Sequence, residues 1–409
     1  MPISTKLVTL GDIKKAQEKL RQVIYPTPIM PAKSFSQHKK LRVYLKLENL
    51  QKTGSFKLRG AFNKLSQLDK QQRERGVIAA SAGNHAQGVA YASSHFHTRA
   101  VIVMPERTPI TKMMATKAYG AEIILYGSCF NDSYDRALKL AEETGMIFIS
   151  PFDDDDIIAG QGTIGLEIIQ QLPKVRTVIV PVGGGGLIAG LAIALKEHNP
   201  TIKVIGVEAK GAASMYESLQ KGYICEPLTI TKTIADGIAV NRPGEKTFPI
   251  IQKLVDEMAL VEEEEIARAI LSFIEEEKLL VEGAGAVPLA ALQEKKLAIE
   301  EGDVVLVVSG GNIDVNTIAR IIEKGLVKSG RLLRVSLELE DVPGTLNKIT
   351  SLIAEEQANI LHIIHDRLSK DLPVGITKLE LDLETRGKEH SKEVITALKA
   401  KGYLPKLIQ

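Results

Sequence analysis

The sequence predicts an α/β fold, in which a two-lobed domain built on open parallel sheets is followed by a smaller ferredoxin-like βαββαβ domain. Two observations indicate this architecture. Between Arg42 and Val308, short apolar runs alternate with helical patterns of about ten or more residues, as in βαβ units whose parallel sheet is covered on both faces. After residue 331, strands and helices follow in the order βαββαβ within about 80 residues.

The expected strands of the first region are short runs of apolar, mainly β-branched residues. They cover residues 42–48, 76–81, 99–105, 121–127, 146–150, 176–183, 202–208 and 303–311. Helical patterns fill the intervals, for example at 87–96, 133–145 and 262–278.

The C-terminal region shows both hydrophobic periods in succession. Apolar residues alternate over 333–339, as in a strand, and recur at helical spacing over 346–353. The remaining expected elements are a strand from Asn359, a strand at 375–384, a helix at 388–402 and a strand at 403–408. We therefore expect one domain over residues 1–325, with a smaller lobe of about residues 42–155 inserted in a larger one, and a second domain over residues 331–409.

The composition excludes several classes of function. The 52 basic and 50 acidic residues are spread along the chain, so no nucleic-acid or membrane-surface partner is indicated. The two cysteines, Cys129 and Cys225, have neither CxxC nor Cys/His spacing, which argues against a zinc site and a disulfide scaffold. Because no signal peptide and no apolar run of about 20 residues is found, we expect a soluble, cytoplasmic protein.

A glycine run at 183–186 is the first candidate for ligand binding. It follows a buried strand and opens a helix, so its amides can turn toward a phosphate. A turn required only for packing is one alternative, although four glycines are entropically costly without a ligand. An NAD-binding oxidoreductase is another, because Gly184, Gly186 and Ala189 satisfy G-x-G-x-x-A and Glu208 ends the next strand, where a ribose-binding acid is expected.

Three further motifs combine with the glycine run. Lys57 in "TGSFKLRGA" would, on its own, be an ordinary solvated lysine. The segment "SAGNHAQG" at 81–88 offers amides and small polar side chains to a carboxylate. Ser309 in "SGGN" ends a strand, at the edge where open α/β sheets bind ligands. An amine, a phosphate cradle, a carboxylate loop and a strand-end hydroxyl together are the parts that a pyridoxal phosphate site requires.

These four segments also carry a family resemblance. Their order and separations are similar to those of tryptophan-synthase-like (fold type II) pyridoxal phosphate enzymes, and over its whole length the chain resembles the threonine dehydratases, or threonine ammonia-lyases. Residues 331–409 resemble an ACT domain, a module that senses amino acids. The resemblance implies β-elimination of water from L-threonine to give 2-oxobutanoate and ammonia, and conversion of L-serine to pyruvate, in isoleucine biosynthesis or threonine catabolism. A serine racemase or serine dehydratase of the same family is the alternative.

The resemblance also implies roles for single residues. Lys57 would be the catalytic amine that holds pyridoxal 5'-phosphate, Phe56 would pack against the cofactor, and Asn84 would bind its phenolic oxygen. A lysine whose pKa falls to about 7–8 could also remove the Cα proton of the substrate. The phosphate would be bound by Gly183, Gly184, Gly185, Gly186 and Leu187, and Ser309 would face the ring nitrogen. The substrate carboxylate would be held by Ser81, Ala82, Gly83, Asn84 and His85.

Two departures from related racemases narrow the prediction. Ala82 stands where serine racemases carry a serine that acts as the second base, so racemisation should be poor. Ser214 stands where metal-binding relatives have a second acid, so Glu208 and the Ala212 carbonyl are expected to hold no tight metal and at most a weak cation. Glu282 is expected either near the substrate pocket or as an exposed acid at a helix start.

The resemblance implies regulation through the C-terminal domain. An effector amino acid would bind at Gly344 and Thr345, where a helix begins, and at Asn359 on the facing strand. A purely structural dimerisation module is the alternative. We expect an allosteric homo-oligomer, either a dimer or a tetramer. The identity of the effector is left open, because isoleucine-regulated dehydratases usually carry a longer, duplicated regulatory region.

Overall fold

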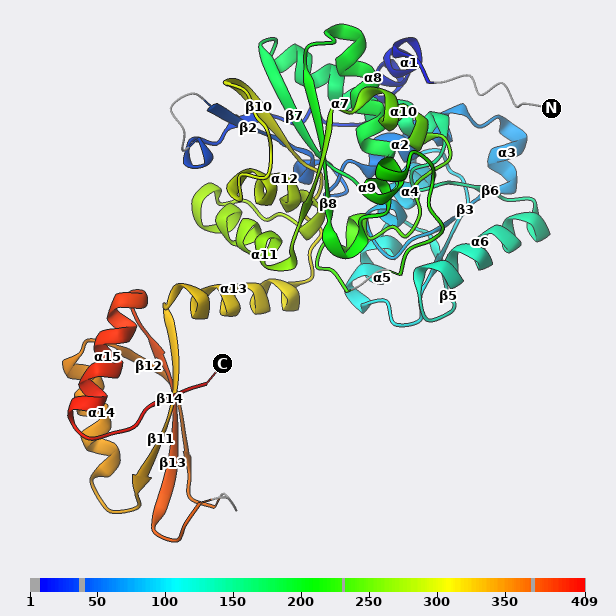
Figure 1. The fold of residues 1–409 in the computed structure, drawn as a ribbon. Coiled ribbons are helices and arrows are strands. Elements are labelled where there is room, and N and C mark those ends of the chain that lie inside the picture. The colour runs from blue at the N-terminus through cyan, green and yellow to red at the C-terminus, as the bar shows by residue number, and fades with distance from the viewer. Residues whose placement is uncertain (1–7, 37–40, 230–231, 369–371, 409) are drawn as a thin grey trace. The chain divides into compact units, whose positions relative to one another are not determined.

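Parallel strands dominate the first part of the chain and an antiparallel sheet the last part, which confirms the predicted fold class (Figure 1). The computed structural model describes residues 8–36, 41–229, 232–368 and 372–408. The chain divides into two units, Met1–Asp314 and Val315–Gln409. The helix α13 (Val315–Ser329) belongs to the second unit in this division.

The larger sheet of the first unit has the strand order β1-β2-β10-β7-β8-β9. Its strands are β1 (Ile29–Pro31), β2 (Leu41–Leu47), β7 (Val175–Pro181), β8 (Lys203–Ala209), β9 (Glu257–Val261) and β10 (Gly302–Val308). All pairs are parallel except β1 with β2. The carboxyl ends of β7 and β10, which lead into the glycine run and Ser309, therefore meet at one edge of the sheet.

The smaller sheet is wholly parallel, with the order β5-β4-β3-β6. Its strands are β3 (Val77–Ala80), β4 (Ala100–Met104), β5 (Glu122–Leu125) and β6 (Ile147–Phe148). Because β2 pairs in the larger sheet, the smaller sheet begins at Val77, which differs from the expected lobe boundary near residue 42.

Helices cover both sheets. They are α1 (Leu10–Leu20), α2 (Lys57–Gln67), α3 (Lys70–Arg75), α4 (Asn84–His95), α5 (Ile110–Lys117), α6 (Phe130–Thr144), α7 (Asp155–Gln171), α8 (Gly186–His198), α9 (Ser214–Lys221), α10 (Thr247–Leu254), α11 (Glu263–Ser272) and α12 (Gly283–Gln293). Short turns of tighter or wider helix are η1 (Lys33–Phe35), η2 (Glu48–Leu50), η3 (Lys210–Ala212), η4 (Asp236–Ile238) and η5 (Phe273–Glu277).

Glycines let α7 pack closely against both α2 and α8. A Cβ atom on Gly160 would lie 2.7 Å from the carbonyl oxygen of Arg59 in α2. A Cβ atom on Gly190 of α8 would lie 2.3 Å from the carbonyl oxygen of Ile158 in α7. Contacts this short are possible only without side chains, so the glycines fix the distances between the three helices that surround the site.

The second unit has the predicted βαββαβ order. Its sheet runs β12-β13-β11-β14, all antiparallel, and α14 and α15 share a core with it. The elements are β11 (Leu332–Glu340), α14 (Thr345–Glu355), β12 (Asn359–Asp366), β13 (Ile376–Glu384), α15 (Lys388–Ala400) and β14 (Lys406–Leu407). The alternating residues Leu333, Val335, Leu337 and Leu339 are all buried in that core, as the period of two predicts.

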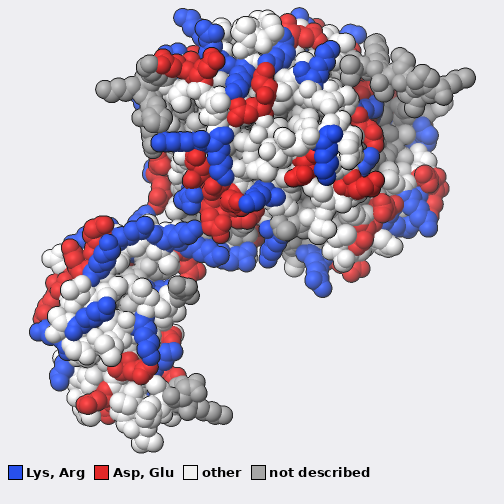
Figure 2. Space-filling view, viewed as in Figure 1, with Lys and Arg blue, Asp and Glu red and all other residues white. Residues whose placement is uncertain are grey.

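The surface agrees with the balanced composition. Acidic and basic side chains are interspersed on the face of each unit that Figure 2 shows. Among the described residues, no helix is both long and apolar enough to cross a membrane.

Candidate active site

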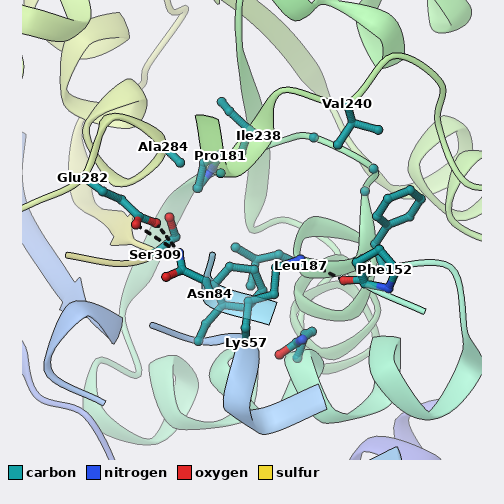
Figure 3. Close-up of a pocket in the computed structure, with 18 residues that line it drawn as sticks. Lys57, Asn84, Phe152, Pro181, Leu187, Ile238, Val240, Glu282, Ala284 and Ser309 are labelled. Atoms are coloured by element: carbon teal, nitrogen blue, oxygen red, sulfur yellow. Dashed lines mark hydrogen bonds between the residues drawn. The ribbon is translucent and has the colours of Figure 1, made fainter. Parts of the chain in front are cut away.

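One pocket of the first unit brings the predicted motifs together (Figure 3). It lies where β7 and β10 end and where α2, α4 and α8 begin, so each helix presents its first turn to the same space. The lining residues are Phe56, Lys57, Asn84, Pro151, Phe152, Gln161, Pro181, Gly183, Gly184, Gly185, Gly186, Leu187, Gly237, Ile238, Val240, Glu282, Ala284 and Ser309.

Lys57 is the first residue of α2 and reaches across the pocket. Its Nζ donates a hydrogen bond to the carbonyl oxygen of Pro151 at 2.8 Å, and the ring of Phe56 lies 5.3 Å from the same nitrogen. Removal from solvent lowers the pKa of Lys57 to about 8, although the nearby charge of Glu282 opposes the shift. Lys57 is therefore an amine that loses its proton near neutral pH.

The glycine run forms an anion cradle. In the part of the chain that the structure describes, the backbone amides of residues 183–187 have no hydrogen-bond acceptor, although these residues are buried. Buried amides are nearly always paired, and amides at a helix N-terminus attract negative charge. Five such amides therefore fit a phosphate group. Because pyridoxal phosphate carries this group, the residues of the pocket fit that cofactor.

Packing also requires these glycines, so the alternative explanation holds in part. A Cβ atom on Gly184 would lie 2.3 Å from the ring of Phe152, and Gly185 has a φ of +96°. Packing does not account for the unpaired amides. The loop is held in place from outside, because the hydroxyl of Thr247 donates to the carbonyl of Gly184 at 2.6 Å and Asp153 accepts from the amides of residues 245–247.

Ser309 follows β10 and is buried in the wall of the pocket. Among the described residues, its hydroxyl has no hydrogen-bond partner, so it is available to a ligand. The amide of Phe56 donates to the carbonyl of Ser309 at 3.1 Å. This bond ties the residue before Lys57 to the end of β10, so that the amine and the hydroxyl face one cavity.

The half-buried Asn84 and the buried Glu282 form a pair in the pocket wall. The Asn84 amide nitrogen donates to both oxygens of Glu282, at 2.7 and 3.0 Å, and Asn312 donates to the Asn84 carbonyl oxygen at 2.8 Å. Burial raises the pKa of Glu282 to about 7, against the lowering effect of the Asn84 bond. Glu282 was expected either near the substrate pocket or as an exposed acid at a helix start. The structure places it in the pocket wall, where it is buried.

The expected carboxylate loop reaches the pocket only through Asn84. His85 is turned away, because its Nε2 contacts the carbonyl of Ile149 at 2.9 Å. Burial lowers the pKa of His85 to about 3. The hydroxyl of Ser81 accepts from the amide of Gly83 at 3.1 Å, and the space beyond the Gly83 Cα is open.

Glu208 serves a helix rather than a ligand. Its two carboxylate oxygens accept from the amides of Met215 and Tyr216 in the first turn of α9, at 3.1 and 2.7 Å. The hydroxyl of Ser214 donates to the carbonyl of Val240 at 2.7 Å, and Ala212 is buried in η3. Burial raises the pKa of Glu208 to about 8, against the lowering effect of these two amide hydrogen bonds. Among the described residues, no group of three or more His, Cys, Asp or Glu side chains could hold a metal.

The three residues expected to bind an effector are not adjacent within one copy of the second unit. Gly344, with a φ of +93°, precedes α14, and Thr345 is its first residue. Asn359 begins β12, after the other end of α14, and its side chain contacts Glu384 at 3.4 Å. The eleven residues of α14 separate the two positions by about 16 Å.

Family models match both units. Residues 20–310 match the model described as pyridoxal-phosphate dependent enzyme. The chain belongs to this family of pyridoxal-phosphate dependent enzymes. Residues 330–401 match the ACT domain. Both resemblances expected from the motifs are thus confirmed. The alternative of an NAD-binding oxidoreductase is not supported, because the matching family depends on pyridoxal phosphate and the carboxylate of Glu208 binds amides of α9.

Related proteins carry specific names. The chain is 51% identical over 392 residues to an L-threonine ammonia-lyase of Geobacter sulfurreducens, covering 96% of this chain and 97% of that one. Threonine deaminase isoform 2 of Solanum lycopersicum superposes with a TM-score of 0.72 at 40% identity, over 78% of this chain and 90% of that one. Maize serine racemase superposes with a TM-score of 0.73 at 36% identity, over 78% and 98%.

Eight of the pocket residues were not predicted from the sequence: Pro151, Phe152, Gln161, Pro181, Gly237, Ile238, Val240 and Ala284. Pro151 contributes its backbone carbonyl, and Phe152 packs against the glycine loop. No local sequence pattern identifies either residue. Gln161 was detectable in principle, because a polar residue between Gly160 and Gly162 in an apolar helix marks a close contact.

Proposed function

We propose that the protein is an L-threonine ammonia-lyase, which converts L-threonine to 2-oxobutanoate and ammonia and also converts L-serine to pyruvate. The observation that carries the proposal is the presence, in one pocket, of the Lys57 amine with a lowered pKa and five amides without acceptors. The similarity to the Geobacter sulfurreducens enzyme along nearly the whole chain supports the substrate.

Different residues of the chain would have different roles in the reaction. Pyridoxal phosphate, when bound, supplies a carbonyl that captures amino groups and a ring that withdraws electrons from Cα. The amides of residues 183–187 would bind its phosphate, and Lys57 would hold its carbonyl carbon. With a pKa of about 8, a substantial fraction of Lys57 is neutral at physiological pH, and it would then accept the Cα proton of the substrate.

The pocket wall favours elimination over slower chemistry. Ser309 would face the ring nitrogen, and a hydroxyl, unlike a carboxylate, does not keep that nitrogen protonated. Asn84, fixed by Glu282 and Asn312, would contact the phenolic oxygen. The substrate carboxylate would be held by backbone amides and Ser81 in the 81–85 loop, because the side chain of His85 is turned away.

Keto-acid release tests this proposal. We expect the protein with pyridoxal phosphate to form 2-oxobutanoate from L-threonine and pyruvate from L-serine. Keto-acid formation from neither substrate would contradict the proposal.

A serine racemase is the second candidate, because the maize enzyme has a similar structure. Ala82 argues against it, since an alanine side chain cannot act as a base. Chiral analysis of serine after incubation distinguishes the two, because a racemase would accumulate D-serine faster than pyruvate.

We further propose that the ACT unit binds an amino-acid effector. Because Gly344 and Thr345 lie at the opposite end of α14 from Asn359, a site that uses all three would need two copies of the unit. This would require a homo-oligomer, a dimer or tetramer. A cytoplasmic location and a role in isoleucine biosynthesis or threonine catabolism fit the proposed reaction.

A further inference from the structure

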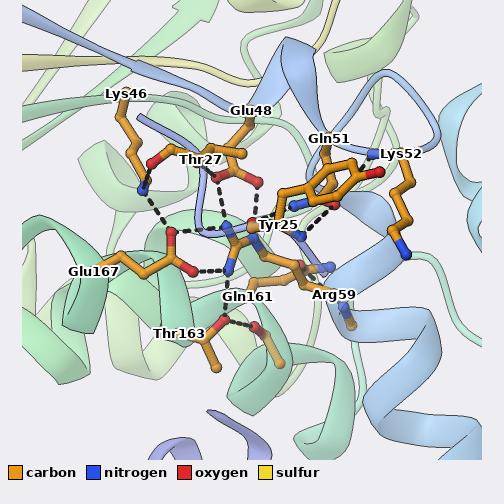
Figure 4. A network of polar contacts seen from close by, with 12 residues as sticks. Tyr25, Thr27, Lys46, Glu48, Gln51, Lys52, Arg59, Gln161, Thr163 and Glu167 are labelled. Atoms are coloured by element: carbon orange, nitrogen blue, oxygen red, sulfur yellow. Dashed lines mark hydrogen bonds and ion pairs between the residues drawn. The ribbon is translucent and has the colours of Figure 1, made fainter. Parts of the chain in front are cut away.

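A second polar cluster lies beside α2, away from the pocket (Figure 4). We call it the Arg59 cluster, and it consists of Lys46, Glu48, Arg59 and Glu167. The four side chains are at most 8% exposed, and their two positive and two negative charges balance. Arg59 follows Lys57 by two residues, which places the two side chains on opposite sides of the helix.

Every donor of the Arg59 guanidinium has an acceptor. Nε and Nη2 donate to the two oxygens of Glu48, both at 2.8 Å. Nη1 and Nη2 donate to the two oxygens of Glu167, at 2.5 and 3.0 Å, and Nη1 also donates to the hydroxyl of Thr163 at 3.2 Å. A guanidinium has five N–H groups in a planar fork, so all five are used, and no other side chain could reproduce this arrangement.

The rest of the cluster ties this fork to the larger sheet. Lys46 in β2 donates to Glu167 at 2.5 Å and to the carbonyl of Thr27 at 2.7 Å, while the hydroxyl of Thr27 donates to Glu48 at 2.5 Å. Burial lowers the pKa of Lys46. Burial alone would raise the pKa of Glu48, but the charge and hydrogen bonds of Arg59, together with Lys46 and Thr27, outweigh it, and the pKa is lowered. The cluster therefore holds the ionised carboxylate of Glu48 in the interior beside Arg59.

The cluster joins α2, which carries the Lys57 amine, to α7, which follows the segment that holds the acceptor of that amine. Arg59 lies in the first turn of α2, next to Lys57, and binds Thr163 and Glu167 of α7. The carbonyl that accepts from Lys57 belongs to Pro151, in the segment that leads into α7. Between these points, the amide of Gly60 donates to the Gln161 side chain at 3.2 Å, and Gln161 itself lines the pocket.

We propose that Arg59 is a positioning residue for Lys57: its clamp on Glu48 and Glu167 fixes the first turn of α2 against α7 and thereby holds the Lys57 amine at the Pro151 carbonyl. The inference rests on the proposed role of Lys57. A purely structural cluster would stabilise the unit without any effect on the state of the amine.

Arg59→Lys tests the proposal, because it keeps the charge and loses the fork. Competitive acylation of the cofactor-free, full-length protein across pH, read by peptide mass spectrometry, gives the pKa of Lys57 without any turnover. We expect this pKa to rise by at least half a unit toward that of a solvated lysine. We also expect the dissociation constant of pyridoxal phosphate to rise at least tenfold. Glu282 and His85, the titratable groups whose interactions with Lys57 are resolved, are unaltered in the variant.

Val101→Ala is the matched control. Val101 is buried in the core between β3, β4 and α6, outside the pocket lining, so its truncation lowers thermal stability without touching α2. We expect it to leave the pKa of Lys57 and the affinity for pyridoxal phosphate unchanged. If Arg59→Lys does not fold, Thr163→Val removes one of the five acceptors at nearly constant shape and should shift both quantities in the same direction by less.

An unchanged Lys57 pKa and cofactor affinity in the folded variant, with only the loss of stability seen in Val101→Ala, would overturn the proposal. Failure of the proposed function would look different. The wild-type protein would then form no keto acid, while the acylation measurement would still report how Arg59 affects Lys57.

Discussion

Lys57 is reactive because the protein solvates its charged form poorly. Among the residues that the structure describes, its amine has one hydrogen-bond acceptor, the Pro151 carbonyl, where a solvated ammonium group would have three water molecules. The pKa consequently falls from 10.5 to about 8. A lysine on the solvent side of the same helix would keep its proton and could not act as a base near neutral pH.

Lys57→Ala should abolish keto-acid release from L-threonine, with a loss of at least about 100-fold, because the protein then lacks the base and the attachment point. Lys64→Ala is the matched control in α2. Its amine pairs with Asp154 and Asp156 outside the pocket, and its removal should change activity less than twofold. Turnover of both purified variants is measured side by side, and full activity in Lys57→Ala would remove it from the mechanism.

Glu282 makes the stability of the cofactor-free protein depend on pH. Its pKa is raised from 4.5 to about 7, so between these values the folded protein keeps a proton that the unfolded chain has lost. The contribution of Glu282 to the free energy of unfolding is therefore fully present below pH 4.5. It decreases by on the order of 3 kcal/mol as pH rises through 7. Glu282→Gln keeps the acceptor for Asn84 and should flatten this decline, which thermal unfolding at pH 5 and pH 7.5 measures. An equally steep decline in the variant would assign it to other groups.

Single residues were predictable where the sequence carries a linked motif. Lys57, Asn84 and Ser309 were found from their neighbours, and all three line the pocket. The orientation of His85 was not predictable, because it depends on the carbonyl of Ile149, which lies 64 residues away in the chain. Gln161 enters the pocket because α7 packs against α2, and its one local signal is its position between two glycines of an apolar helix.

At the scale of elements, the glycine loop that joins β7 to α8 is tightly packed on one side and carries unpaired amides on the other. Phe152, Thr247 and Ile251 surround it so closely that side chains do not fit, and its amides have no acceptor within the described part of the chain. Packing from outside thus determines the shape of the loop, and we expect its unpaired amides to bind the cofactor phosphate.

Gly185→Ala should weaken cofactor binding at least tenfold. The added Cβ would lie 2.7 Å from Ile251 and 2.8 Å from the Thr247 hydroxyl, at a φ of +96°, so the loop must move. Gly222→Ala is the matched control at the end of α9. Its φ is +79°, but the space around it is open, so the substitution should cost only about 1 kcal/mol of backbone strain and leave cofactor affinity unchanged. Equal affinities in both variants would contradict the cradle.

Elements with strong patterns were predicted to within a few residues, and weaker ones were missed. The buried strands of the larger sheet, such as β7 and β10, are continuous apolar runs because helices cover both faces. β1 was missed because it is a three-residue edge strand that ends in proline. β9 was missed because its sequence, EMALV, contains only one β-branched residue.

For the whole molecule, the pocket and the ACT match lie in different units of the chain. Every residue that lines the pocket lies before Asp314, whereas the ACT match begins at residue 330. The fold class and the order of the elements in both units followed from hydrophobic periodicity. The distribution of strands between the two sheets did not, because β2 pairs with β10, more than 250 residues further along the chain.

A chain that ends at Asp314 should keep keto-acid release within about twofold of the full-length protein, because it retains the pocket and a core of its own. It should lose any change in activity that isoleucine, valine or serine causes in the full-length protein. Initial rates with each amino acid, in both proteins, provide the comparison. Identical responses would reject effector binding by the C-terminal unit.

The most direct test of the central claim is reduction of the protein with borohydride in the presence of pyridoxal phosphate, followed by peptide mass spectrometry. Borohydride makes the bond between an amine and the cofactor permanent, so the labelled residue identifies the amine. We predict a pyridoxyl group on Lys57 and loss of the label in Lys57→Ala. A label on a different lysine, or none, would contradict the assignment of this pocket.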